Sequence, residues 1–159
     1  MRNKKRIMSK LLWISMILIF GLAAFPIAAS AQMPTQASAD VQVANDPKLG
    51  PILVDGSGRT LYLFMADKPG MSSCSGACLA AWPAFSLPSG KSPTGSPAVT
   101  GKLGTITRPE GTVQVTVNNL PLYYFIKDMK PGDVTGQGIN AFGGLWWAVK
   151  PDGTPNTGG

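Results

Sequence analysis

Short apolar runs, separated every few residues by glycine and proline, set the pattern of this chain. Residues 113–117 (VQVTV) alternate apolar and polar side chains, which is typical of a strand with one buried face. Residues 61–64 (LYLF) and 122–126 (LYYFI) are apolar on both faces, which is typical of strands covered by packed layers on both sides. No long segment after residue 31 shows a helical repeat, so we expect an all-β fold.

The pattern is duplicated. L-Y-x-F-x-x-D followed by K-P-G occurs at residues 61–70 and again at 122–132. Each copy follows a strand-like run and a turn, and precedes a glycine-rich stretch that ends on tryptophan. We therefore expect two tandem related β-hairpin repeats, at 48–85 and 103–150, joined by a glycine- and proline-rich linker at 86–102. Because about 50 residues are marginal for independent folding, the repeats should share one core in a single domain, 48–150.

The N-terminus has the form of an export signal. A basic segment is followed by an apolar run at 11–24 and by the small-x-small sequence Ala-Ser-Ala at 29–31. This predicts a signal peptide at 1–31, cleaved before Gln32, and a mature protein in the periplasm or outside the cell with no stable membrane span. The alternative is an uncleaved anchor, because the apolar segment is nearly long enough to cross a bilayer.

The two ends of the mature chain have few large apolar residues. Residues 32–47 are rich in alanine, glutamine, serine and proline and predict a flexible leader. Residues 151–159 (PDGTPNTGG) predict a disordered tail.

Charge and composition exclude several functions. The chain has 14 Lys and Arg residues against 8 Asp and Glu, but five of the basic residues lie in the predicted signal, so the mature chain is near neutral. This balance supplies no basic patch for nucleic acid. The chain has no histidine, which excludes histidine-based catalysis and histidine metal ligands.

The only two cysteines, Cys74 and Cys78, have C-x3-C spacing. In an exported protein this spacing predicts a local disulfide, and the good helix formers at 77–81 predict one short helix beside it. Two alternatives remain open: a dithiol that cycles between redox states, and a soft site for Cu(I) that also uses Met65 and Met71. We expect no bound metal and no cofactor.

Two further groups of residues are candidates for chemistry or binding. Asp67 and Asp128 occupy matching places, and they either cap turns by accepting backbone N–H bonds or form an acid–base pair. We expect capping, and therefore no enzymatic activity. Trp146 and Trp147 should point to opposite faces of a strand, so that one of them is exposed and can contact a ligand.

The motif Y-x-[FWY]-x-x-D, at 62–67 and 123–128, resembles that of a bacterial family of secreted repeats and predicted lipoproteins named for it. The residues that carry the motif are Tyr62, Phe64, Asp67, Tyr123, Phe125 and Asp128. Residues 73–83 (SCSGACLAAWP) and 136–147 (GQGINAFGGLWW) also resemble that family, although the chain lacks the lipobox cysteine that many members carry.

The resemblance implies an exported envelope protein whose biochemical role is unestablished. We expect a non-enzymatic binding or structural β module with an unidentified envelope partner or ligand. The alternative is a periplasmic redox or copper-binding protein that uses the C-x3-C pair.

Overall fold

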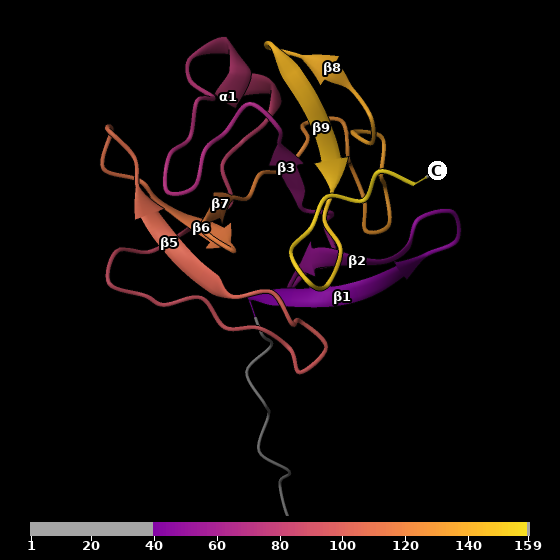
Figure 1. Ribbon diagram of the computed structural model, residues 1–159. Coiled ribbons are helices and arrows are strands. Elements are labelled where there is room, and N and C mark those ends of the chain that lie inside the picture. Colours follow the sequence, from indigo (N-terminus) through magenta and orange to yellow (C-terminus); the bar gives the residue numbers. More distant parts are fainter. Residues whose placement is uncertain (1–39, 159) are drawn as a thin grey trace, which may run out of the picture. The chain divides into compact units, whose positions relative to one another are not determined.

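Short antiparallel strands and one helical turn make up the fold (Figure 1). The computed structural model describes residues 40–158, so the predicted signal at 1–31 and the first half of the predicted leader, 32–39, lie outside the described residues. The all-β prediction is confirmed, as is the short helix. The elements are β1 (Val41–Asp46), β2 (Gly50–Asp55), β3 (Tyr62–Phe64), α1 (Ala77–Ala81), β4 (Ser86–Leu87), β5 (Leu103–Thr107), β6 (Val113–Val117), β7 (Leu120–Pro121), β8 (Asn140–Ala141) and β9 (Gly144–Ala148).

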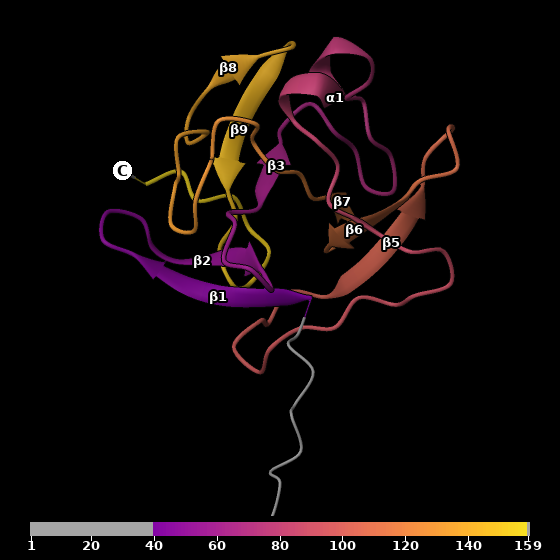
Figure 2. The same ribbon diagram turned by 180° about the vertical axis from the view of Figure 1, so that it is seen from behind.

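The strands form three small sheets, with β1 pairing β2, β9 lying between β3 and β8, and β6 lying between β4 and β5 while also pairing β7. All of these pairings are antiparallel. Figure 2 shows the same arrangement from behind, with the β1–β2 and β5–β6 hairpins on separate sides of the molecule. In residues 40–158, no helix is long and apolar enough to cross a membrane.

The two repeats have the same hairpin followed by the same return strand. In the first repeat β1 pairs β2, and the Leu61 amide then donates to the Leu53 carbonyl at 3.0 Å. In the second repeat β5 pairs β6, and the Leu122 amide donates to the Val115 carbonyl at 2.9 Å. This correspondence confirms the predicted duplication.

The predicted flexible leader is wrong over its last part. Val41 to Asp46 form β1, which pairs with β2 along its whole length. Val41 itself is fully buried, and its amide donates to the carbonyl of Thr94 at 2.9 Å. The composition of the whole segment 32–47 hides the strand, which is held in place by the backbone ladder with β2 and by the packing of Val41 and Val43 in the core.

The predicted disordered tail is also wrong within the described residues, and the first two residues of the predicted linker belong to a strand. Asn156 is buried; its amide donates to the Ala148 carbonyl and its side chain to the Leu49 carbonyl, both at 2.8 Å. Part of the predicted linker forms β4, which pairs with β6. These segments are fixed by backbone hydrogen bonds that hydrophobic periodicity does not report.

The core lies on both faces of the motif segments, as their double-sided apolar pattern predicts. Tyr62 and Phe64 pack into one buried cluster, whereas Leu61 and Leu63 pack into the other. Each cluster takes residues from both repeats. The repeats therefore share their interior, because neither can bury its apolar residues without the other.

The second motif segment differs from the expected long strand. Tyr123 forms single bridges to Tyr62 and Ala84 and belongs to no longer ladder. Ile126, which was expected to be buried, is 52% exposed. The apolar run thus continues one residue beyond the edge of the core, which the sequence pattern cannot reveal.

Candidate functional site

The two motif tyrosines meet at the centre of the molecule. The amide of Tyr62 donates to the Tyr123 carbonyl at 2.9 Å, and the amide of Tyr123 donates back at 3.0 Å. The Tyr62 hydroxyl donates to Asp128 at 2.6 Å, and the Tyr123 hydroxyl donates to Asp67 at 2.6 Å. Each repeat therefore supplies the tyrosine that binds the aspartate of the other repeat.

Each aspartate also holds the loop that follows it. Asp67 Oδ1 accepts the Ser73 amide and hydroxyl, both at 2.7 Å. Asp128 Oδ1 accepts the Thr135 amide at 3.0 Å and its hydroxyl at 2.6 Å. The expected capping of backbone N–H groups is confirmed. The second oxygen of each carboxylate accepts the hydroxyl of the motif tyrosine from the other repeat, and we call these two bonds the crossed tyrosine bonds.

Burial determines the ionisation of the motif tyrosines. Loss of water around the phenol raises the pKa of Tyr62 well above its ordinary value, and the hydrogen bond to Asp128 raises it further. The same two causes, burial and the hydrogen bond to Asp67, raise the pKa of Tyr123. Both phenols are therefore neutral hydrogen-bond donors at physiological pH.

Four aromatic rings form a stack beside the two tyrosines. The centroid distances are 4.1 Å from Phe64 to Trp146, 3.9 Å from Trp146 to Trp82 and 4.2 Å from Trp82 to Phe125. Tyr62 meets Trp82 edge-on at 5.4 Å, and Tyr123 meets Trp146 edge-on at 5.2 Å. The stack alternates between the repeats and ties them together.

The structure separates the two tryptophans proposed as ligand contacts. Trp146 is completely buried in the aromatic stack, so it is the member of the pair that a ligand cannot reach. Trp147 is only partly buried and lies next to Gly138. Of this pair, Trp147 alone retains exposed surface that a ligand can reach.

The cysteines form the expected disulfide. Cys74 and Cys78 are joined with their Cα atoms 5.3 Å apart, and both side chains are buried. Cys78 lies in α1, and its carbonyl accepts the amide of Trp82 at 2.7 Å. The bridge therefore fixes the turn that delivers Trp82 to the aromatic stack.

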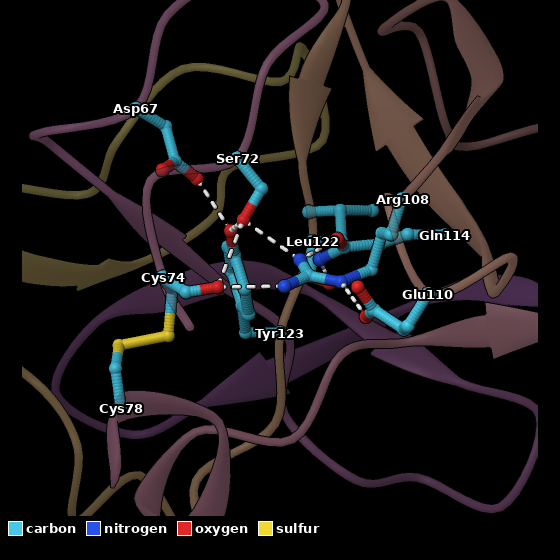
Figure 3. Close-up of polar contacts among 9 residues, drawn as sticks. All are labelled: Asp67, Ser72, Cys74, Cys78, Arg108, Glu110, Gln114, Leu122 and Tyr123. Carbon is cyan, nitrogen blue, oxygen red and sulfur yellow. Dashed lines mark hydrogen bonds and ion pairs between the residues drawn. A yellow bond between two sulfur atoms is a disulfide. The ribbon is translucent and has the colours of Figure 1, made fainter. Parts of the chain in front are cut away.

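A buried arginine, whose role the sequence did not predict, continues the polar network (Figure 3). Arg108 Nη1 donates to Ser72 Oγ and Gln114 Oε1, both at 2.7 Å. Its Nη2 donates to the Cys74 carbonyl at 2.6 Å, and its Nε donates to the Glu110 carboxylate. Ser72 Oγ also lies 2.6 Å from the Tyr123 hydroxyl, so the guanidinium is linked to the second motif.

The second repeat carries polar residues where the first is apolar or oppositely charged. In the second hairpin Arg108 pairs with Thr112. At the same place in the first hairpin, Asp46 pairs with Gly50, so an arginine stands where the first repeat has an aspartate. By the same register, Gln114 stands where the first repeat has Ile52. Aligning the two repeats residue by residue would have revealed this departure.

Comparison with known proteins agrees with the duplication. A family model described as a secreted repeat of unknown function matches residues 43–86 and again 104–150, together more than half of the chain. The first match begins inside β1, in agreement with the corrected boundary of the leader. Searches of curated proteins and of solved structures found no match. The chain belongs to the family of secreted repeats of unknown function.

Proposed function

We propose that this exported protein is a non-enzymatic binding module of the cell envelope. The observation that carries the proposal is that the polar groups of the repeated motif bond to one another. Both oxygens of Asp67 and of Asp128 accept hydrogen bonds from tyrosine and loop groups. Carboxylates that accept hydrogen bonds on both oxygens position the loops around them, which supports a structural role for the motif over acid–base catalysis.

Binding is tested directly with envelope material. Full-length exported protein, purified from the envelope and immobilised, is exposed separately to envelope proteins and to envelope polysaccharides. We expect saturable binding to one of the two fractions, measured by surface plasmon resonance. Protein unfolded by denaturant and reductant is the control and should not bind. Absence of saturable binding to either fraction would contradict the proposed function.

The competing hypothesis is a redox or copper protein working through Cys74 and Cys78. Both sulfurs are engaged in one bond and both residues are buried, which supports a structural role. A structural bridge of this kind resists the glutathione pool, with a reduction potential below about −300 mV.

We therefore expect no thiol labelling of the native protein equilibrated at about −200 mV, the poise of an oxidising compartment. The measurement is the mass shift after alkylation, and the same protein unfolded in reductant is the positive control. Labelling of native Cys74 and Cys78 near that poise would instead favour the redox hypothesis.

A further inference from the structure

A hollow of about 450 Å³ lies beside β5 and β6 of the second repeat, away from the crossed tyrosines. This volume falls within the range of about 300–1,000 Å³ that is usual for small-molecule sites. No residue of the repeated Y-x-[FWY]-x-x-D motif lines this hollow. Its lining residues are Lys102, Leu103, Gly104, Thr105, Thr116, Asn118 and Asn119.

One lining residue is a buried threonine whose hydroxyl has no partner. Thr116 is only 1% exposed, and its side chain makes no hydrogen bond within residues 40–158. No fully buried side-chain oxygen or nitrogen in that part of the chain lacks a partner, so the Thr116 hydroxyl is open to the hollow. A hydroxyl that is accessible in this way is hydrated in the free protein, and a ligand hydroxyl can take the place of that water.

The strand opposite leaves this hydroxyl accessible. Gly104 pairs with Thr116 in the β5–β6 ladder, and a Cβ atom at Gly104 would lie 3.2 Å from Thr116 Oγ1. In the first repeat the same ladder position pairs Gln42 with Val54. The duplicated hairpin thus provides an internal comparison, in which the second repeat has lost a large side chain and gained a hydroxyl.

The turn formed by Asn118 and Asn119, at the end of the hollow, is fixed by hydrogen bonds within the protein. Asn118 Oδ1 accepts the Lys102 amide at 2.9 Å, and Asn118 Nδ2 donates to the Asp152 carbonyl at 2.8 Å. Asn118 and Asn119 both have positive φ, of 48° and 69°, as a tight two-residue turn requires. Because these hydrogen bonds fix the turn, it does not need to be ordered by a ligand.

The lining residues include two threonines, two asparagines and one lysine, and none of them carries a carboxylate. Hydroxyls and carboxamides can both donate and accept, which matches the hydroxyls of a sugar. The ammonium group of Lys102 favours a ligand that also carries a carboxylate. We propose that the hollow binds an acidic sugar, a uronate unit of an envelope polysaccharide. This inference rests on the proposed binding function and names its ligand class.

The probe for this proposal is sodium glucuronate, titrated into isotopically labelled full-length exported protein and followed by NMR. We expect shifts of backbone amides confined to the residues that line the hollow. Glucose should move the same amides with about 3- to 10-fold weaker affinity, because it lacks the carboxylate that pairs with Lys102. Sodium acetate should leave them unmoved, because it lacks the hydroxyls.

Substitutions of lining residues, compared with one substitution outside the lining, then test whether binding depends on the hollow. Thr116→Val, which installs the residue type of the first repeat, should weaken glucuronate binding about 3- to 10-fold without lowering the melting temperature. Gly104→Gln should abolish binding, and the smaller Gly104→Ala covers the case in which Gln prevents folding and should also weaken it. Thr107→Val, on β5 next to the strand of Thr116 but outside the hollow, is the matched control and should bind as the unmodified protein does.

Three results would overturn the uronate proposal. These are the absence of lining shifts with either sugar, equal binding of acetate and glucuronate at the same amides, and equal affinities for Thr116→Val and Thr107→Val. If sugars fail while the envelope fractions still bind, the ligand class is wrong and the proposed binding function stands. If the fractions also fail, both are wrong.

Discussion

Replacing Trp82 with alanine is expected to unfold both repeats in a single transition. Trp82 belongs to the first repeat, but it is stacked against Phe125 and Trp146 of the second and is almost completely buried. Removing so large a buried ring costs about 3–5 kcal/mol in the free energy of unfolding. Because small domains are stable by only about 5–15 kcal/mol, the loss should consume a large part of the total.

Denaturant unfolding followed by tryptophan fluorescence and by far-ultraviolet circular dichroism measures this effect. The matched control is Phe142→Ala, since that ring is half exposed at the β8–β9 turn and its truncation should change stability by less than about 0.5 kcal/mol. Two resolved transitions, with only the first repeat weakened, would show that the repeats have separate cores.

Much of this arrangement is predictable because it depends on local patterns. The double-sided apolar motif predicts that Tyr62 and Leu61 face different parts of the core, and the structure confirms it. The C-x3-C spacing and the alanines around it predict the disulfide and α1. What could not be predicted is β1, because its three apolar side chains are small and lie in a polar stretch, although Val41 packs into the core and the backbone pairs with β2.

The candidate site shows the same division. Capping by Asp67 and Asp128 follows from their place before a turn, and the structure confirms it. That each carboxylate is also bound by the tyrosine of the other repeat could not be foreseen, because it depends on how the repeats pair in space. The role of Arg108 depends likewise on contacts between the repeats, with Ser72 and the Cys74 carbonyl.

The departures from internal symmetry are the most informative features for function. A motif kept in both repeats, as the Tyr62 and Tyr123 segments are, serves the shared core. The pair Gly104 and Thr116 has no counterpart of the same chemistry in the first repeat. Unlike Arg108 and Gln114, whose side chains are taken up in buried hydrogen bonds, the Thr116 hydroxyl bonds to no other group of the described residues, and this is why we search for a ligand beside it.

Alkaline pH is expected to unfold the protein cooperatively, with all three of its tyrosines ionising together. The chain has three tyrosines, and burial raises the pKa of each one, with a neighbouring aspartate adding to the effect. In the unfolded chain a tyrosine has a pKa of about 10. The folded pKa is the higher one, so the stability from these groups is complete below about pH 10 and is lost as the pH rises above it.

Each tyrosine that is ionised only in the unfolded state lowers the free energy of unfolding by about 1.4 kcal/mol per pH unit above its unfolded pKa. Three such groups give about 4 kcal/mol per pH unit, enough to unfold a domain of ordinary stability within a few pH units. Tyrosinate absorbance and tryptophan fluorescence should therefore change together. Tyr62→Phe and Tyr123→Phe, as matched single variants, should each reduce the slope by about one third. Gradual tyrosinate formation near pH 10 with native tryptophan fluorescence would contradict the buried, aspartate-bound state of these phenols.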